Sequence, residues 1–456
     1  MIQKINDWFT QHEKQLCDLS FEIWGHPELS EQEDYAANCL IGILRENGFK
    51  IESNIAGLST AFKAVWGSGS PRIGFLAEYD ALPGLSQSVS TKKQPVEGQM
   101  LGHGCGHNLL GVGAVGAGIA LKAALEENGL SGTVIVYGCP SEEIMVGKIV
   151  MAQHHVFDDL DIALSWHPSD MNCASEMSYQ AMLSLDYEFN GKASHAAMAP
   201  HEGFSALDAV ELMNVGANYL REHMPPGSQI HYVITNGGEK PNIVPEKAAV
   251  WYFIRARTTN DINRVKERLD KIAQGASLMT GASFSSSIRT GCNETKIVPE
   301  IVKLLHHVME NDVLPPNWNE DEKDFSRELM INMGLDMTSI SFAFGEDVEK
   351  SPLHDGVLQP TGKVLPIMGS SDISDVSWIV PTGMLFIACY PKGTPNHTWG
   401  VTACSGMSIG QKGMLYASKI LAIAGMHLVK SPELLDRIKL SYSSMMGSER
   451  YQHYKE

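Results

Sequence analysis

The chain has 456 residues, with 35 Lys and Arg against 53 Asp and Glu, so its formal net charge at pH 7 is −18. This length is typical of two or three domains, and 43% hydrophobic with 19% charged residues indicates a folded globular protein. The negative charge argues against a nucleic-acid partner and against adsorption to an anionic membrane, because both partners attract basic patches.

Signals for a membrane or for export are not evident in the sequence. The longest uncharged apolar stretch covers residues 109–121 and is shorter than the ~18 residues that a spanning helix requires. The first residues lack the apolar core of a signal peptide. The eight cysteines are scattered and form no compact disulfide framework, so we expect them to be reduced. The prediction is a cytoplasmic protein with no membrane contact.

The first part of the chain alternates helical and strand patterns. Strands separated by helices predict crossover connections, and therefore an α/β domain with a mixed, largely parallel sheet flanked by helices. In chain order the predicted elements are a helix at 33–47, a strand at 73–76, a helix at 109–127, a strand at 133–137, a helix at 145–155 and a strand at 162–166.

The pattern changes after residue 177. The following elements have the order strand, helix, strand, strand, helix, strand, which is that of a ferredoxin-like βαββαβ domain. They are predicted at 182–189, 205–222, 229–235, 248–257, 261–279 and 284–289. We therefore divide the chain into a first part of a larger domain at 1–177, an inserted domain at 178–291 and a second part of the larger domain at 292–456.

Cys105 and His107 form the first candidate ligand pair, separated by a single glycine. The glycine leaves the backbone free to turn both side chains toward one point. Thiolate and imidazole groups are good ligands for zinc and other first-row metals. An isolated pair of this kind is more often a buried Cys beside a loop His, but the neighbouring glycines and the helix that follows favour a metal site.

Carboxylates and further histidines lie near other predicted strand ends, where ligands bind in open α/β sheets. Glu142 and Glu143 follow the strand at 133–137, so one can bind a metal while the other takes a proton from water. The alternative is a solvated acidic turn. His167 and His397 are each more often structural when considered alone. Together these positions supply enough ligands for two metals about 3.5–4 Å apart.

Three motifs resemble the M20 family of metallopeptidases and amidohydrolases. They are Leu-Ala-Glu-Tyr-Asp-Ala-Leu-Pro at 76–83, Gly-His-Gly-Cys-Gly-His-Asn at 102–108 and Ser-Asp-Ile-Ser-Asp-Val-Ser-Trp at 371–378. The likeness lies with the aminoacylase-like branch, and within it with the aminobenzoyl-glutamate utilisation subgroup. It covers nearly the whole chain. It implies a di-metal exopeptidase-like catalytic domain with an inserted lid or dimerisation domain.

The resemblance implies two divalent metal ions per subunit, either zinc or manganese, and a general base, Glu142, that acts on a metal-bound water. The implied metal ligands are Cys105, His107, Glu143, His167 and His397. Asn108 stands where better-known relatives have Asp, and it can still orient a ligating His through a hydrogen bond. Whether Glu78 or Asp80 touches the metal is left open.

The inserted domain contributes three further residues through the same resemblance. His195 would stabilise the oxyanion, often in the active site of a partner subunit. Asn242 and Arg255 would hold a substrate carboxylate, because a guanidinium can grip a carboxylate with two hydrogen bonds. Arg257 faces the same side of its strand and is the alternative. Asp372 and Asp375 belong to the third motif, but their task does not follow from the sequence.

The expected function is metal-dependent hydrolysis of the amide bond in N-acyl or N-aroyl amino acids, such as p-aminobenzoyl-glutamate, or in dipeptides. The expected partner is a small-molecule substrate with a carboxylate. We expect a homodimer through the inserted domain, or assembly with a related subunit. Two alternatives remain at this stage: a cysteine amidase in which His107 activates Cys105 without a metal, and a non-catalytic subunit of a heteromer.

Overall fold

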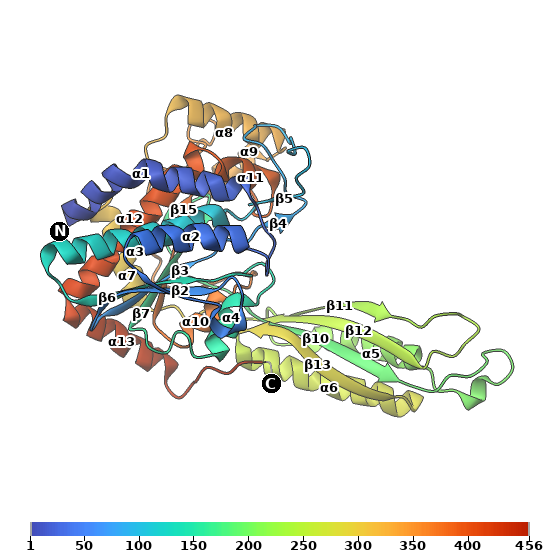
Figure 1. Ribbon diagram of the computed structural model, residues 1–456. Coiled ribbons are helices and arrows are strands. Elements are labelled where there is room, and N and C mark those ends of the chain that lie inside the picture. The colour runs from blue at the N-terminus through green and yellow to red at the C-terminus, as the bar shows by residue number, and fades with distance from the viewer. Residues whose placement is uncertain (1, 455–456) are drawn as a thin grey trace. The chain divides into compact units, whose positions relative to one another are not determined.

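The structure, a computed structural model, describes residues 2–454 and divides into two compact units. Within the described residues, the larger unit comprises 2–176, 296–364 and 376–450, and the smaller unit comprises 177–295, 365–375 and 451–454. Each unit has a hydrophobic core of its own. Figure 1 shows the large sheet in the first and the small sheet in the second.

The larger unit contains a seven-stranded sheet in the order β1-β2-β6-β3-β7-β15-β8. The central pairs β6–β3, β3–β7 and β7–β15 are parallel, whereas the strands at the two edges pair antiparallel. This confirms the predicted mixed, largely parallel sheet. Its strands are β1 (Lys50–Ser53), β2 (Phe62–Ser68), β3 (Arg72–Ala77), β6 (Gly132–Gly138), β7 (Ile162–Ser169), β8 (Cys173–Ala174) and β15 (Thr382–Ala388).

Helices flank this sheet, as the α/β pattern predicts. The first of them, α1, was not expected from the sequence. The helices of this part of the chain are α1 (Ile2–Gly25), α2 (Asp34–Glu46), α3 (His107–Asn128), α4 (Gly147–Gln153), α7 (Pro299–Asn311), α8 (Glu320–Asn332), α9 (Met337–Phe344), α11 (Trp399–Ser405), α12 (Ser408–Lys430) and α13 (Pro432–Met446), and a short helix α10 spans Ile373–Ser377.

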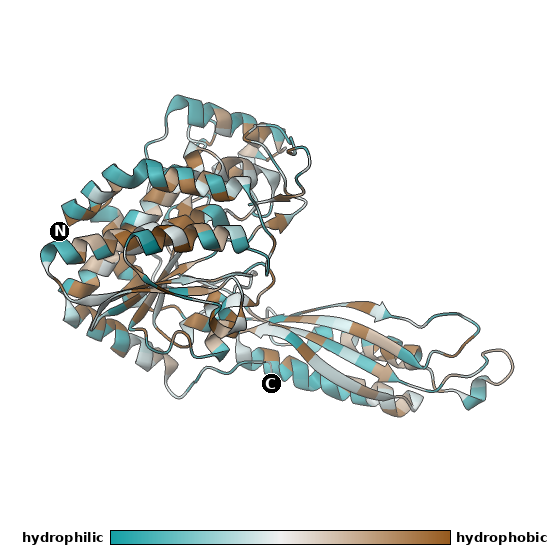
Figure 2. Ribbon diagram, in the orientation of Figure 1, coloured by the Kyte–Doolittle hydropathy of each residue, from teal (hydrophilic) through white to brown (hydrophobic). Residues whose placement is uncertain are grey.

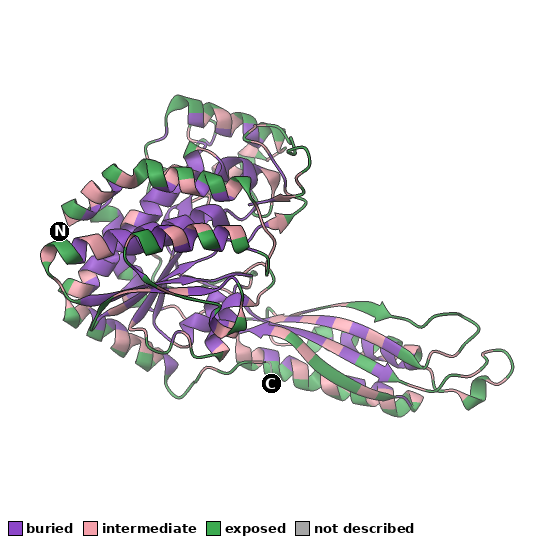
Figure 3. Cartoon of the chain, viewed as in Figure 1, coloured by how far each residue is buried: buried purple, intermediate pink, exposed green. Residues whose placement is uncertain are grey.

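The helix α3 forms the centre of the larger core, in contact with α1, α12 and the sheet. Figures 2 and 3 show it as an apolar and buried element. Its small residues permit this close approach: a Cβ on Gly113 would lie 2.8 Å from the ring of Trp166. By length and composition α3 would be long enough to cross a membrane, but 89% of its most apolar window is buried in the protein, as in a core helix.

The smaller unit has an antiparallel sheet in the order β11-β12-β10-β13, with two helices. Chain order and strand order together confirm the predicted ferredoxin-like fold. Side chains of β12 alternate between buried and partly exposed (Figure 3). The elements are β10 (Ala181–Asn190), α5 (Ala206–Leu220), β11 (Gln229–Asn236), β12 (Lys247–Ala256), α6 (Thr259–Thr280) and β13 (Ser283–Cys292).

Residues 365–375 also belong to the smaller unit, although they lie within the predicted second catalytic part, 292–456. A short parallel ladder ties them there, because β14 (Leu365–Pro366) pairs with β9 (Met177–Ser178). Asp375 strengthens the connection: its carboxylate oxygens accept hydrogen bonds from the backbone N and Nδ2 of Asn293, at 3.1 and 2.9 Å. The third sequence motif therefore contributes a structural anchor.

Candidate metal centre

Cys105 and His107 lie at the start of α3, where the chain enters the helix from a two-stranded ribbon of β4 (Leu82–Pro83) and β5 (Leu101–Gly102). The sequence argument placed this pair at a strand end of the large sheet. In the structure, the pair instead follows the short ribbon. Gly106 makes the turn, with a φ of 76° and no room for a Cβ, which would lie 2.9 Å from Pro168. Only glycine fits this turn, which brings both side chains to the same region.

His167 lies within β7 and not beyond its end, and its ring contacts Cys105. The His167 Nε2 atom is 3.3 Å from the Cys105 sulfur. The other ring nitrogen, Nδ1, donates to the carbonyl of Pro168 at 2.7 Å, so Nε2 carries the lone pair. Burial, and then the charge of His107, lower the pKa of His167 to about 4. At neutral pH this imidazole is uncharged, which is the form that binds a metal.

His107 is oriented by Asp80. Its Nδ1 lies 2.9 Å from Asp80 Oδ1, and the same carboxylate accepts a hydrogen bond from Ser30 Oγ and another from the backbone N of Glu143, both at 2.9 Å. Burial opposes ionisation of Asp80, but these bonds hold its pKa below the usual value. The His107 Nε2 atom is buried and has no hydrogen-bond partner among residues 2–454. An acceptor carboxylate on one ring nitrogen leaves the other for a metal.

Glu142 and Glu143 follow β6 on a turn with an unusual backbone. Ser141 has a φ of 59°, and its backbone N donates to the buried carboxylate of Glu33 at 2.8 Å. Glu143 Oε2 lies 3.4 Å from His397 Nε2, whereas its Oε1 is buried without a hydrogen-bond partner in the described part of the chain. Burial raises the pKa of Glu143. A buried carboxylate of this kind is favourable only beside a cation.

His397 reaches the same place from the loop after β15. Its backbone N donates to the carbonyl of Gly104 at 3.0 Å, which ties this loop to the turn before α3. Its φ is 59°, one of seven left-handed backbones at non-glycine positions among residues 2–454, and Ser141 is another of them. Such conformations are costly and concentrate at functional sites.

These five side chains form what we call the ligand cluster. Their ligand atoms fall into two triads, and within each triad the atoms lie within 4.8 Å of one another. The thiol of Cys105 belongs to both triads. The triads are Cys105 with His107 and His167, and Cys105 with Glu143 and His397. Two buried atoms make no hydrogen bond among the described residues, and one belongs to each triad: His107 Nε2 and Glu143 Oε1. The donor set and these two atoms fit a pair of divalent cations.

Asp80 is the residue that orients His107, and Asn108 has a different task. The Asn108 amide donates to the carbonyls of Ser20 and Ser405, at 3.1 and 3.0 Å, so it ties α1 and α11 to α3. The sequence had left Asp80 unassigned. Its place in the 76–83 motif, three residues after β3, was the signal available.

Glu78 lies beside the ligand cluster in an ion pair that the sequence did not reveal. Its Oε2 is 3.5 Å from His107 Nε2, and its Oε1 is 2.8 Å from Nζ of Lys148, whose side chain is fully buried. Glu78, His107 and Glu142 form a third group of ligand atoms within 4.8 Å of one another. Burial raises the pKa of Glu78, but the charges of Lys148 and His107 outweigh it and lower the pKa overall.

His195 and Asn242 lie on adjoining segments of the smaller unit. Residues 195 and 243 form a β-bridge, and the backbone N of Ala196 donates to the carbonyl of Asn242 at 3.1 Å. The backbone amides of Ala197 and Met198 both donate to His195 Nδ1 at 3.2 Å. With Nδ1 accepting, the neutral ring carries its proton on Nε2 and can donate there.

Arg255 lies on β12, on the partly exposed side of the strand, and its Nη1 is 3.3 Å from Ser370 Oγ. Its guanidinium also lies 5.9 Å from the ring centroid of Phe253. Arg257 is exposed near Gly227. Both arginines therefore belong to the smaller unit together with His195 and Asn242.

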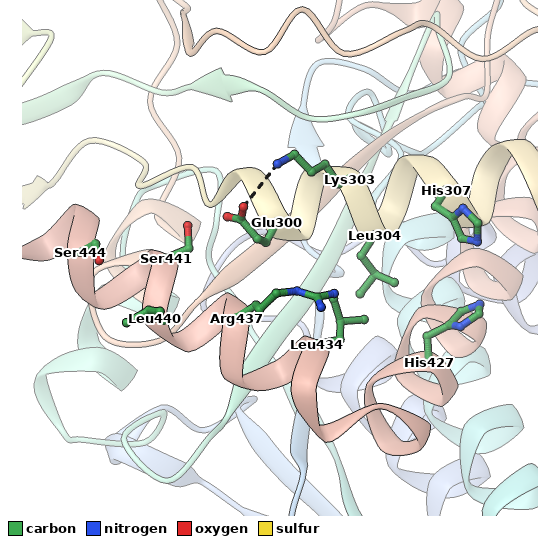
Figure 4. Close-up of a pocket in the computed structure, with 10 residues that line it drawn as sticks. All are labelled: Glu300, Lys303, Leu304, His307, His427, Leu434, Arg437, Leu440, Ser441 and Ser444. Atoms are coloured by element: carbon green, nitrogen blue, oxygen red, sulfur yellow. Dashed lines mark hydrogen bonds and ion pairs between the residues drawn. The ribbon is translucent and has the colours of Figure 1, made fainter.

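A separate cavity of about 700 Å³ lies between α7 and α13, away from every site residue predicted from the sequence. Figure 4 shows His307 and His427 pointing toward each other at one end of it. These histidines and Asp312 also form a group within 4.8 Å, but His427 Nε2 is 2.8 Å from Asp312 Oδ2 and His307 Nδ1 is 3.1 Å from Asn311. These polar atoms have partners, whereas the ligand cluster contains buried polar atoms without a hydrogen bond among the described residues.

Comparisons with known proteins show which family the chain resembles. The family model of a peptidase dimerisation domain matches residues 180–278, within the smaller unit. The chain is 35% identical to one of the subunits of p-aminobenzoyl-glutamate hydrolase from Escherichia coli (strain K12), over 98% of this chain and 96% of that protein. It is 30% identical to the Xaa-Arg dipeptidase of Mus musculus, over 96% and 91% of the two chains.

Among solved structures, the fold is similar to that of a dinuclear metal-binding peptidase of the M20 family from Bacillus subtilis. The TM-score is 0.61 at 14% identity, and the match covers 92% of this chain and 99% of the other. At this identity the likeness concerns the fold, which includes both units.

Proposed function

Because this chain belongs to the M20 family of metal-dependent peptidases and amidohydrolases, we propose that it hydrolyses the amide bond of N-acylated or N-aroylated amino acids, or of dipeptides. One observation carries the proposal. In the ligand cluster two triads share one thiol, and each triad has a buried polar atom that makes no hydrogen bond among the described residues. Amide hydrolysis by paired cations needs such a donor set.

In this proposal, Cys105, His107 and His167 hold one divalent cation, and Cys105, Glu143 and His397 hold the other. Zinc and manganese both suit this mixture of thiolate, imidazole and carboxylate. When bound, the cations would polarise the amide carbonyl and lower the pKa of the attacking water. Everything else in the reaction is supplied by residues of the chain.

Glu142 acts as the general base. It takes a proton from the attacking water as the oxygen–carbon bond forms, and it returns that proton to the amine nitrogen as the carbon–nitrogen bond breaks. Its carboxylate lies within the group of Glu78, His107 and Glu142, next to the ligand cluster. The strained backbone of Ser141 and its bond to Glu33 fix the turn that carries Glu142.

His195 stabilises the oxyanion of the tetrahedral intermediate. This role is supported by the two backbone amides that donate to Nδ1 and so place the ring proton on Nε2. Asn242 and Arg255 bind the carboxylate of the substrate, for which the partly exposed guanidinium is suited. A Lys substitution at Arg255 keeps the charge and removes the two-bond grip, so it tests this role through KM.

For the substrate we propose an aroyl-glutamate such as p-aminobenzoyl-glutamate, because the relative named for it covers almost the whole chain. The Xaa-Arg dipeptidase relative suggests a basic residue instead. A panel of N-aroyl-glutamate, N-acetyl amino acids and Xaa-Arg dipeptides, assayed with zinc, manganese and cobalt in turn, distinguishes these classes. A kcat/KM that is highest for the arginine dipeptides would reject the aroyl-glutamate assignment.

The mechanism is tested by Glu142→Ala and Glu142→Gln. We expect turnover to fall by at least a factor of about 100, while the content of divalent metal stays unchanged, because a general base contributes a factor of 10²–10⁴. Glu126→Ala, at an exposed position of α3, is the matched control and should keep full activity. Full activity of the Glu142 variants would refute the proposed base.

A cysteine nucleophile is disfavoured by the burial of Cys105, although its sulfur lies 3.3 Å from His167 Nε2. Burial raises the pKa of the Cys105 thiol, whereas a nucleophilic cysteine requires the opposite shift. Treatment with a chelator separates the two mechanisms. Loss of activity that is restored by added metal supports the proposed one, and an acyl-thioester trapped on Cys105 supports the other.

For the assembly we propose a homodimer through the smaller unit, or a pairing with a related subunit. The dimerisation-domain match supports this, and so does the Escherichia coli relative, which is one subunit of a hydrolase. The edge strand β11 also presents Val233 and Ile234 to solvent. Light scattering on purified protein would give twice the 49.9 kDa chain mass for the homodimer.

All eight cysteines are free thiols, which supports a cytoplasmic location.

A further inference from the structure

A fully buried lysine lies beside the proposed metal centre. The Lys148 side chain has no exposed surface, and its Nζ is 2.8 Å from Oε1 of Glu78, which is itself 4% exposed. The other oxygen of Glu78 is 3.5 Å from His107 Nε2, the atom that would bind the metal. A positive and a negative charge, both buried, therefore adjoin a cation site. Lysine is almost never fully buried unless it is paired.

The fold fixes both partners from the segments that also carry the catalytic residues. Glu78 is the first residue after β3, and Lys148 is the second residue of α4. The start of α4 packs tightly on the turn after β6, because a Cβ on Gly147 would lie 1.7 Å from the carbonyl oxygen of Pro140. The backbone N of Val146 also donates to the carbonyl of Ser141 at 3.1 Å. The lysine is thus held in place by the turn that carries Glu142.

Stability alone does not account for this pair. The cost of removing two charges from water commonly equals or exceeds their attraction, and replacing a buried pair by apolar groups is often neutral or stabilising. A lysine beside a cation site also repels the cation. A functional explanation must therefore concern the cation itself.

We propose that Glu78 and Lys148 are a pair of positioning residues that sets the affinity of the His107 position for its divalent cation. The Glu78 carboxylate attracts the cation, whereas the Lys148 ammonium repels the cation. The ammonium also holds Oε1 of Glu78 in the ion pair, so that only Oε2 faces His107. This inference rests on the proposed function, because it requires a cation beside His107. It assigns the pair a role outside the five residues of the ligand cluster.

The test is a double-mutant cycle on the whole 456-residue chain, with the dissociation constant for Zn²⁺ or Mn²⁺ measured by competition against a chromophoric chelator. Glu78→Gln leaves the lysine uncompensated and should weaken binding by about 10- to 100-fold, the range found when residues around metal ligands are changed. Lys148→Met should tighten binding by about 10-fold. The double variant should return to within about threefold of the wild type, and Lys148→Arg should retain the wild-type constant.

Opposite changes in metal affinity in the two single variants distinguish this role from a merely structural ion pair. Breaking a structural pair would reduce the stability of the protein without moving metal affinity in opposite directions. The control is Lys412→Met, which breaks a 2.7 Å pair with the buried Glu322 and should leave metal affinity unchanged. Metal affinities that shift in the same direction, or do not shift, in Glu78→Gln and Lys148→Met would overturn the inference while the proposed function stands. Wild-type protein that binds no divalent cation would refute the proposed function as well.

Discussion

At the scale of single residues, the positions around the proposed metal ligands determine what these ligands can do. Asp80 accepts three hydrogen bonds, and these come from His107, from Ser30 and from the backbone of Glu143. The Asp80 carboxylate therefore orients His107, in the first triad, and the backbone of Glu143, in the second triad. A change at Asp80 should disturb both triads.

Asp80→Asn is expected to reduce metal affinity or kcat/KM by about 10- to 100-fold, because the neutral amide cannot keep all three acceptor contacts and no longer stabilises the proton on His107 Nδ1. Metal content and steady-state kinetics check this. Asp159→Asn, in a partly exposed pair with Arg72, serves as the control and should behave as the wild type. Unchanged kinetics and metal content in Asp80→Asn would mean that His107 does not need this hydrogen bond.

The protonation of the ligand cluster predicts how metal affinity depends on pH. Burial raises the pKa of Cys105, and contacts with Cys105 and Asp80 outweigh burial to raise the pKa of His107. Without metal these groups therefore keep protons at neutral pH, whereas a metal binds the thiolate and the free imidazole nitrogen. The metal-free state holds more protons, so affinity should rise with pH.

We expect affinity to rise about tenfold per pH unit for each proton released, and at least one proton to be released between pH 6 and pH 8. His167 adds nothing in this range because its pKa is about 4. Calorimetric titration in two buffers with different heats of ionisation measures the proton count. His195→Ala should give the same count, and a release of zero in the wild type would contradict the assigned protonation states.

Sequence motifs located the residues of the ligand cluster but not the contacts between them. Cys105 and His107 stand out because they share one short motif, and Glu142 and Glu143 because they are adjacent. The bonds of Asp80 join residues 27 and 63 positions apart along the chain, and no local pattern reveals such pairs. The same reason explains why Lys148 was missed: it looked like an ordinary helix residue.

At the scale of elements, periodic patterns were sufficient for the ferredoxin-like part of the smaller unit, but not for residues 365–375, which also belong to it. The patterns were less informative for helix boundaries. The helix predicted at 145–155 spans only Gly147–Gln153, because Met145 has a φ of 58° and cannot continue a right-handed helix. The helix α1 was missed because only Ile5, Phe9, Leu16, Ser20 and Ile23 are buried in its 24 residues.

Two glycines within helices should respond oppositely to the same substitution. A Cβ on Gly113 in α3 would lie 2.8 Å from Trp166, so Gly113→Ala should destabilise the protein by about 1–3 kcal/mol through overpacking. Gly42 in α2 has no atom within 4 Å of a Cβ, so Gly42→Ala should stabilise it by about 0.5–1 kcal/mol. Urea denaturation measures both changes, and equal effects would contradict the close packing inferred for α3.

At the scale of the whole molecule, the net charge of −18 proved a poor guide to the metal centre. The carboxylates near the ligand cluster are few: Glu143 belongs to it, and the buried Glu78 and Asp80 contact His107. Net charge describes the surface and its solubility, whereas a metal site depends on the direction of a few side chains. The division into two units is informative instead, because the five residues of the ligand cluster all belong to one of them.

Metal removal should therefore loosen one unit selectively. A ligand that binds only the folded state stabilises it by about 2.7 kcal/mol at a concentration 100 times its dissociation constant. The ligand cluster joins segments of the larger unit around 105–107, 142–143, 167 and 397, so chelation should lower the stability of this unit and increase amide exchange there. The smaller unit has its own hydrophobic core, so exchange in β10–β13 should not change.

Hydrogen–deuterium exchange with and without chelator measures both regions. Glu142→Ala is the control and should show the same pattern as the wild type, since a general base holds no metal; equal loss of protection in both units would contradict this confinement.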